Sequence, residues 1–241
     1  MAKVKIVSGM VFERHEKKYL LTQSQYNSLM PSLMEHMQQD QYGLHTICSL
    51  YFDTEDFLLI RRSLEKPEYK EKLRLRSYGI PKQEDTVFLE LKKKLTGITY
   101  KRRSPMTLYE AEQYLRYDIP PKQTGQIIDE IGWFKERYHP EPKVLLFYNR
   151  IALYSMADSR LRITFDTNIR WRDEQLSFTS GDYGAYLISP SESLMEIKLE
   201  GAFPCWLSHL LAEQKIYPVS FSKYGMAYRK ISHKEEKEYV G

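Results

Sequence analysis

The sequence predicts an α+β fold in which strands from both ends of the chain close one sheet, with helices inserted between the strands. Segments in which charged and aliphatic residues alternate recur from near residue 14 to near residue 199, and this period of two is typical of half-buried strands. Segments with apolar residues at helical spacing lie among them. No composition shift, long linker or internal repeat divides the 241 residues. We therefore expect a single domain over residues 1–241, with a flexible tail after about residue 231.

Composition places the chain among ordinary globular proteins. Hydrophobic residues make up 42% and charged residues 28%, so a substantial core is expected and disorder is not. The net charge of +4 permits an acidic ligand without requiring one. Cys48 and Cys205 are far apart and lack zinc-ligand spacing, so we expect a reduced, cytoplasmic location. No apolar stretch is long enough for a signal peptide or a membrane span, which predicts no direct membrane insertion.

The first half of the chain predicts a strand, a helix and then several strands. A strand over residues 9–21 leads into a helix near Ser24, which carries Tyr26, Leu29, Leu33 and Met37 at helical spacing. Residues 45–52 follow as a strand and 53–64 as a helical turn or loop. Strands are then expected over residues 72–78, 87–94 and 98–103, the last two joined as a hairpin by a turn at 95–97.

The second half begins with two helices, over residues 108–117 and 124–138. Strands are expected over 144–154 and 161–166, joined by a turn at 158–160, and then over 169–178 and 193–199. A last helix begins near Pro204 and ends before Pro218. Helices packed outside one antiparallel sheet therefore complete the predicted architecture.

Alternation along the strands separates cations from aliphatic residues. Residues two apart share one face of a strand, so Lys72, Arg74 and Arg76 lie opposite Leu73 and Leu75. The division recurs in five further sets: Arg14, Glu16 and Lys18; Glu90, Lys92 and Lys94; Lys101 and Arg103; Arg160, Arg162, Thr164 and Asp166; Glu196 and Lys198. Lys93 and Arg102 fall on the other side of their strands, where we expect them to be solvated.

Repetition of this pattern favours a binding site over an ordinary solvated sheet face, although a single strand of this kind is typical of any half-exposed sheet. If the faces converge, their cations repel at low dielectric, and a polyanion such as a phosphate chain would relieve the repulsion. Arg and Lys suit phosphate, whereas a carboxylate among cations suits Mg²⁺ or Mn²⁺. Glu196 is the first metal candidate, followed by Glu16 and Glu90.

Nine short motifs occur in a fixed order along the chain. The first half contains Arg14-His15-Glu16-Lys17-Lys18-Tyr19, Leu50-Tyr51-Phe52-Asp53-Thr54, Leu73-Arg74-Leu75-Arg76-Ser77-Tyr78-Gly79, Leu89-Glu90-Leu91-Lys92 and Tyr100-Lys101-Arg102-Arg103. The second half contains Tyr148-Asn149-Arg150, Leu161-Arg162-Ile163-Thr164-Phe165-Asp166, Met195-Glu196-Ile197-Lys198 and Phe221-Ser222-Lys223-Tyr224. Together, from about residue 12 to about residue 229, they resemble the VTC domain, the polyphosphate polymerase branch of the triphosphate tunnel metalloenzymes.

The resemblance implies a closed antiparallel β-barrel, or tunnel, of about eight strands with helices packed outside. It carries the phosphate-binding positions over to Lys18, Arg74, Arg76, Lys92, Lys101, Arg150, Arg162 and Lys223, and the metal-binding glutamate to Glu196. We accordingly predict catalytic roles for Lys18, Arg74, Arg76, Lys92, Arg150 and Arg162. We predict substrate contacts for Arg14, Lys101, Arg103, Lys198 and Lys223.

The implied activity is transfer of the ATP γ-phosphoryl group to a growing polyphosphate chain, assisted by Mn²⁺ or Mg²⁺. ATP and inorganic polyphosphate are the expected partners, with no nucleic acid and with any membrane coupling supplied by a separate protein. The family's relatives carry a second lysine where this chain has Ser220, which would weaken product binding at one mouth of the tunnel.

Two alternatives stay open at this point. One is a metal-dependent tripolyphosphatase or nucleoside triphosphatase, although Arg14 stands where the sister branch of hydrolases has a glutamate. The other is a non-catalytic module that binds polyphosphate or nucleic acid through its basic residues and tyrosines.

Overall fold

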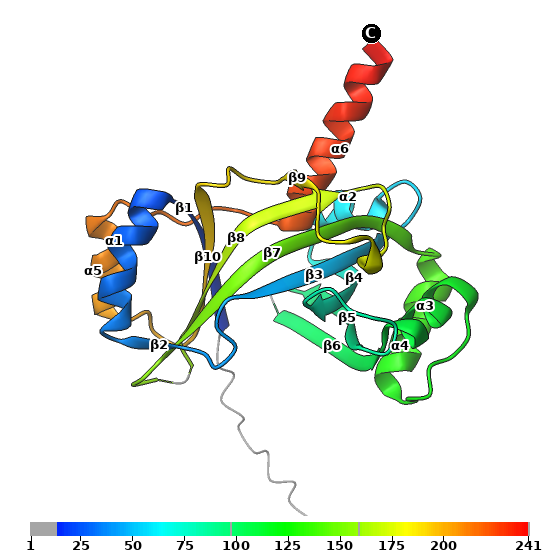
Figure 1. Ribbon diagram of the computed structural model, residues 1–241, viewed down its shortest axis with the longest axis horizontal. Helices are drawn as coiled ribbons and strands as arrows, with labels where there is room; N and C mark the ends of the chain where they lie inside the picture. Colours follow the sequence, from blue (N-terminus) through cyan, green and yellow to red (C-terminus); the bar gives the residue numbers. More distant parts are fainter. Residues whose placement is uncertain (1–13, 97, 159, 241) are drawn as a thin grey trace, which may run out of the picture. The chain divides into compact units, whose positions relative to one another are not determined.

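The computed structural model describes residues 14–96, 98–158 and 160–240, without the side chains of Arg14 and of residues 235–240. The predicted contact of the Arg14 side chain therefore lies outside the described residues. The elements of the first half are β1 (Arg14–Thr22), α1 (Gln23–Met34), β2 (Met37–Gln39), β3 (His45–Asp53), α2 (Leu58–Leu64), β4 (Tyr69–Tyr78), β5 (Thr86–Leu95), β6 (Ile98–Thr107), α3 (Leu108–Tyr117) and α4 (Gln126–Tyr138). The second half contains β7 (Glu141–Ser155), β8 (Arg162–Arg172), the 3₁₀ helix η1 (Phe178–Ser180), β9 (Ala185–Tyr186), β10 (Glu192–Glu200), α5 (Cys205–Glu213) and α6 (Lys223–Val240) (Figure 1).

The strands form an antiparallel sheet, which confirms the α+β prediction. Hydrogen bonding within the described residues gives the order β1-β10-β8-β7-β3-β4-β5-β6, with β2 paired to β7 and β9 paired to β8. This path has two ends, so hydrogen bonds between the described strands do not close the sheet into a barrel. No helix among the described residues is long and apolar enough to cross a membrane.

The first of two compact units contains the described residues up to Gly43 together with residues 151–165 and 191–220. Its core gathers Leu29 and Leu33 of α1, Leu207 of α5, and aliphatic residues of β1 and β10. A capping box starts α1, since Thr22 and Gln25 exchange side-chain and backbone hydrogen bonds. The helix ends at Met34, so Met37 lies in β2 and not in the helix where the spacing had placed it.

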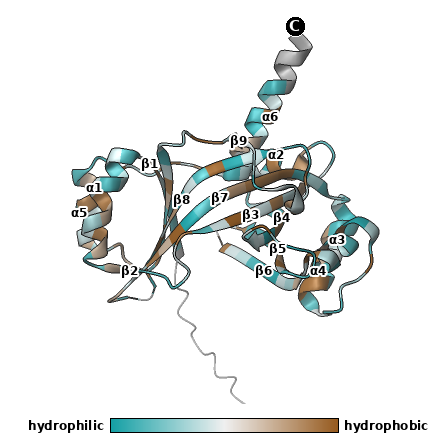
Figure 2. Ribbon diagram, in the orientation of Figure 1, coloured by the Kyte–Doolittle hydropathy of each residue, from teal (hydrophilic) through white to brown (hydrophobic). Residues whose placement is uncertain are grey.

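The second unit contains residues 44–150, 166–190 and the chain from residue 221 onward. Strands β4, β5 and β6 form a meander whose aliphatic side packs on α3 and α4, through residues such as Leu73, Leu89, Leu108 and Ile131. Figure 2 shows hydrophobic and hydrophilic segments alternating along β7, as expected for a strand with two different faces. The other side of the β4–β6 meander faces away from α3 and α4, and it carries polar groups.

Lys93 and Arg102 correct the expectation that they are simply solvated. Both pair with Glu130 of α4, at 3.1 Å for the lysine and 3.3 Å for the arginine. The sequence pattern placed them correctly on the aliphatic side of β5 and β6, but it did not show that a helix brings a carboxylate there.

Two further segments differ from the sequence prediction. Residues 169–178 are not a separate strand: β8 continues to Arg172, with Asn168 in a left-handed conformation (φ 49°) that leaves the strand unbroken, and Phe178 lies in η1. Helix α6 was not predicted, although Tyr224, Ala227 and Ile231 are spaced as one helical face and are buried. It continues past residue 231 into the segment for which we expected a flexible tail.

Candidate functional site

One face of the β4–β6 meander is lined with cations, and we call it the cationic face. It comprises Lys72, Arg74 and Arg76 of β4, Glu90 and Lys92 of β5, and Lys101 and Arg103 of β6. Cross-strand register sets these residues side by side: Lys72 pairs with Lys92 and Lys92 with Lys101, whereas Arg74 pairs with Glu90 and Glu90 with Arg103. Leu73 and Leu75 lie in the hydrophobic core, which confirms the predicted division of β4 into two faces.

Glu90 is the centre of the cationic face and is only 1% exposed. Its Oε2 accepts a hydrogen bond from Arg74 Nε at 2.6 Å, and its Oε1 accepts one from Arg103 Nε at 2.7 Å. Lys101 Nζ lies 3.0 Å from Oε1, and Arg76 Nε lies 3.9 Å from Oε2. Burial opposes ionisation, but the positive charges of Arg74, Arg76 and Lys101 outweigh it and hold the pKa of Glu90 far below its ordinary value.

Hydroxyl groups hold the same guanidinium groups from a second side. Arg74 Nη1 donates to the Tyr51 hydroxyl at 3.0 Å, and Arg103 Nη2 donates to the Tyr78 hydroxyl at 2.9 Å. Burial acts to raise the pKa of Tyr51, but the charges of Arg74 and Arg76 prevail and lower that pKa to about 8. These donors are therefore fixed in direction before any ligand is present.

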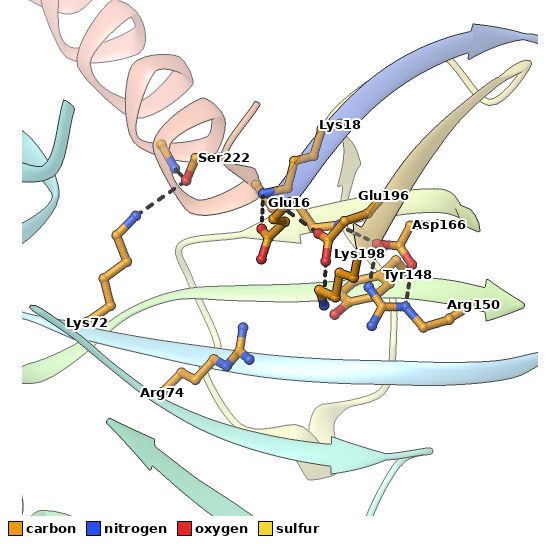
Figure 3. A network of polar contacts seen from close by, with 12 residues as sticks. Glu16, Lys18, Lys72, Arg74, Tyr148, Arg150, Asp166, Glu196, Lys198 and Ser222 are labelled. Carbon is orange, nitrogen blue, oxygen red and sulfur yellow. Dashed lines mark hydrogen bonds and ion pairs between the residues drawn. The ribbon is translucent and has the colours of Figure 1, made fainter. Parts of the chain in front are cut away.

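A second buried carboxylate organises two more of the predicted residues. Asp166 of β8 is fully buried and accepts two hydrogen bonds from Arg150 of β7, at 2.6 and 2.7 Å (Figure 3). Lys223 Nζ lies 2.5 Å from the same carboxylate. Burial opposes its ionisation, but Lys223 and Arg150 hold the pKa of Asp166 far below its ordinary value. The Tyr148 ring contacts both cations, 5.2 Å from Arg150 Cζ and 4.5 Å from Lys223 Nζ.

Glu90 and Asp166 reduce the repulsion between cations that the sequence predicted. We expected the converging cations to repel one another until a polyanion bound. In the structure, Glu90 and Asp166 already counter part of that charge from within the second unit. The cations therefore do not by themselves require an external ligand. They favour binding because their donors are already held in fixed directions.

The first unit holds a separate group of four residues, which we call the β1–β10 cluster: Glu16, Lys18, Glu196 and Lys198. Register pairs Lys18 with Glu196 and Glu16 with Lys198 on the two strands. Lys18 Nζ lies 3.4 Å from Glu16 Oε1 and 3.8 Å from Glu196 Oε2, and Lys198 Nζ lies 2.5 Å from Glu196 Oε1 (Figure 3). Two carboxylates thus approach the same ammonium group.

The β1–β10 cluster is compatible with a divalent metal, but not as a complete cage. Carboxylate oxygens are the ligands that Mg²⁺ and Mn²⁺ prefer, and Mg²⁺ is commonly held by one or two carboxylates, with phosphate oxygens and water supplying the rest. Among the described residues, no group of three His, Cys, Asp or Glu side chains could hold a metal ion. Glu16 and Glu196 therefore fit a metal that arrives with a phosphate ligand.

The remaining predicted residues have less specific surroundings. Arg162 of β8 is 55% exposed in its side chain and lies 3.6 Å from Asp40, in the first unit. Arg160, grouped with it from spacing, lies outside β8 and pairs instead with Asp158 in the preceding turn. Lys92 lies at the cross-strand position between Lys72 and Lys101.

Sequence reasoning missed the residues that support the cations, including Asp166, Tyr51 and Tyr148. It also missed Asp53, a fully buried carboxylate at the end of β3 that accepts hydrogen bonds from the backbone of Leu59 and Ile60 in α2 and from the Tyr224 hydroxyl. Each of these residues falls within one of the nine motifs, so the sequence pointed to its position. Their long-range partners could not be read from the sequence: Arg150 lies 16 residues from Asp166, and Tyr224 lies 171 residues from Asp53.

Comparison with known proteins gives a family and one curated relative. The sequence matches the VTC domain family over residues 13–232. It is 24% identical over 208 residues to the vacuolar transporter chaperone complex subunit 4 of Trypanosoma brucei brucei, which covers 68% of this chain. This chain spans about a quarter of the length of that relative (26%).

Solved structures that match this chain include two bacterial proteins, each described as an adenylate cyclase candidate. The one from Bacillus halodurans is 16% identical, covers 87% of this chain and 95% of its own, and has a TM-score of 0.53. The one from Vibrio parahaemolyticus is 11% identical, covers 90% and 98%, and has a TM-score of 0.47. At these identities the likeness to the Bacillus protein shows a shared fold alone.

Proposed function

Because this chain belongs to the VTC domain family, we propose that it is a polyphosphate polymerase that transfers the γ-phosphoryl group of ATP to a growing polyphosphate chain. The observation that carries the proposal is the cationic face, where guanidinium and ammonium groups from three adjacent strands point to one side and are held by Glu90. A phosphate chain presents repeated anionic oxygens that such a row of donors can bind.

The protein's part in the reaction is to bind, orient and neutralise charge. Arg74 and Arg103 offer planar donors suited to phosphate oxygens, and Lys101 adds a point charge beside them. Arg150 and Lys223, both held by Asp166, supply a second pair of donors. These groups stabilise negative charge on the phosphoryl group as it transfers, which is the main catalytic requirement of phosphoryl transfer.

Glu196 and Glu16 are the residues that would hold the metal. When bound, Mn²⁺ or Mg²⁺ would supply further neutralisation of the phosphate oxygens. Lys18 contacts both carboxylates and Lys198 contacts Glu196, and the two ammonium groups limit metal binding until a phosphate ligand offsets their charge. Glu90 is a poor metal candidate because both its oxygens already accept from cationic donors.

The proposed reaction needs no general base. The attacking phosphate oxygen is already ionised at neutral pH, so no proton has to be removed from it, in contrast to attack by water. We also propose that the protein forms a closed tunnel, is cytoplasmic and has a separate membrane partner, on the basis of the resemblance and the sequence.

Incubation of the purified protein with ATP and Mn²⁺ tests the proposal. We expect equal release of ADP and incorporation of phosphate into chains long enough to resolve by gel electrophoresis. Glu196→Gln should lower this activity by about 100-fold or more, because it removes one of two metal-facing carboxylates while preserving side-chain size. Glu192→Gln, at the start of the same strand, is the matched control.

The competing function is hydrolysis of triphosphates, and one observation favours keeping it. Two carboxylates, Glu16 and Glu196, contact the same Lys18 amine, so more than one acidic ligand is available on that face. Analysis of the products separates the two functions. Free phosphate without chains would replace the polymerase proposal with the hydrolase.

A further inference from the structure

Glu90 has surroundings that the proposed reaction does not require. It is buried beneath four cationic side chains, and its two oxygens divide them: Arg103 and Lys101 approach Oε1, whereas Arg74 and Arg76 approach Oε2. The register of β4, β5 and β6 places it between Arg74 and Arg103 in the middle of the meander. A carboxylate at this position occupies donors that a phosphate ligand would otherwise use.

We propose that Glu90 is a fixed internal anion that positions Arg74, Arg103 and Lys101 for a phosphate chain and at the same time limits the affinity of the cationic face, so that product can leave. This inference rests on the proposed function in one respect only, that the cationic face binds polyphosphate. It makes Glu90 a positioning residue and not a metal ligand.

The positioning role follows from how each guanidinium is held. Arg74 is fixed between Glu90 on one side and the Tyr51 hydroxyl on the other, and Arg103 is fixed between Glu90 and the Tyr78 hydroxyl. The Arg103 guanidinium also lies over the Phe88 ring, 4.3 Å from its centroid. Long side chains fixed in this way lose little freedom when a ligand binds.

The limit on affinity follows from charge. Glu90 carries a full negative charge in a buried setting, where Coulomb interactions are far less screened than in water. A phosphate group bound by Arg74 and Arg103 would lie next to that charge and be repelled by it. The phosphate group would also have to share the donors of Arg74 and Arg103 with Glu90, which continues to accept hydrogen bonds from them. Both effects weaken the binding of a polyanion and speed its release.

Glu130 provides a matched comparison on the opposite side of the same strands. It pairs with Lys93 of β5 and Arg102 of β6, so it has the same kind of partners from the same two elements. These partners belong to the side that packs on α4, away from the cationic face. Neutralising Glu130 therefore changes the protein's net charge by the same amount without touching the donors of the cationic face.

The test compares the affinity of Glu90→Gln, Glu130→Gln and wild type for tripolyphosphate, by calorimetry in EDTA without ATP. We expect the Kd of Glu90→Gln to fall by about tenfold and its salt dependence to become steeper, because one fixed negative charge is lost beside the ligand. Glu130→Gln should stay within about twofold of wild type. An unchanged or weaker affinity for Glu90→Gln overturns the proposal, because positioning without any limit on affinity, or a metal-binding role, predicts that outcome.

Thermal unfolding covers the case in which Glu90→Gln is unstable without ligand, since its cations would lack their counter-charge. Tripolyphosphate should then raise its Tm by more than it raises the Tm of wild type, and an equal or smaller rise overturns the proposal. Glu90→Asp keeps the charge and should show no gain in affinity. Because these assays contain neither ATP nor metal, a failure to form ADP or polyphosphate would count against the proposed reaction alone.

Discussion

At the scale of single residues, buried acceptors decide what the cations of the second unit can do. Glu90 and Asp166 have few exposed atoms, yet between them they fix most of the donors that the family resemblance assigns to phosphate. Tyr51 and Tyr78 complete the support of two guanidinium groups. The geometry of these cations therefore depends on acidic and tyrosine residues to which we assign no phosphate contact.

Tyr51 predicts a pH dependence of phosphate binding. Its pKa is lowered to about 8 because Arg74, Arg76 and Lys72 outweigh the effect of burial, and its ring stacks on Tyr224, 4.7 Å away. As the pH rises through about 8, the phenol loses its proton and places a new negative charge beside Arg74. We expect the affinity for tripolyphosphate to fall by about threefold to tenfold between pH 7 and pH 9 in wild type.

Tyr51→Phe supplies the control for this prediction. The variant keeps the ring but cannot ionise, so any remaining pH dependence reports the ligand's own titration and other groups. The difference in absorbance at 295 nm between wild type and Tyr51→Phe should show one tyrosinate forming near pH 8. Parallel affinity curves for the two proteins would contradict the role given to Tyr51.

At the scale of elements, the first turn of α6 is tied to β3, α2 and β8. Tyr224 donates to Asp53 at 2.8 Å, and Lys223 contacts Asp166 in the same turn. Ser222 accepts from the Gly225 backbone and from Lys72 at 3.5 Å (Figure 3). Asp53 in turn accepts from three backbone N–H groups around the start of α2. One short segment therefore closes several buried hydrogen bonds together.

Tyr224→Phe tests the strength of this connection. Removing the hydroxyl takes one donor from the buried Asp53 carboxylate, so we expect the free energy of unfolding to fall by about 1–3 kcal/mol. Denaturant unfolding measures the change. Tyr228→Phe, one turn further along and packed on Phe57, is the control and should change stability by less than about 0.5 kcal/mol. Equal losses in the free energy of unfolding for the two variants would show that the hydrogen bond to Asp53 adds no particular stability.

Much of the fold follows from local patterns, because strand alternation and helix caps depend on near neighbours in the sequence. The hairpin of β5 and β6 and the helices α3 and α4 fall close to their predicted bounds. The faces of β4 were also predictable. The partners of Glu90, Asp166 and Asp53 were not, because they depend on which strands become neighbours and in what register. Arg160 shows the reverse case, where a local turn bond to Asp158 overrode the strand pattern.

At the scale of the whole molecule, the modest net charge of +4 conceals how unevenly the charge is arranged. Polyanion binding should therefore stabilise the folded chain well beyond what a nonspecific ion achieves. At about 100 times its Kd, tripolyphosphate should add about 2.7 kcal/mol and raise Tm by roughly 5–10 °C. Scanning calorimetry measures the rise. Sulfate at equal ionic strength is the control, and an equal rise with sulfate would contradict specific binding.

The hydrogen bond between Asp53 and Tyr224 joins positions 171 residues apart. Asp166 likewise pairs with Lys223, which lies 57 residues further along the chain. During synthesis, the strands that carry the cations emerge from the ribosome long before the turn that fixes them. Contacts of such long sequence separation form late and slowly. A copy of this protein that lacked α6 would thus hold two buried acids that each lack one partner, because Asp166 would keep Arg150 and Asp53 would keep its backbone donors. Competence to handle a phosphate chain would be gained only in the last moments of folding.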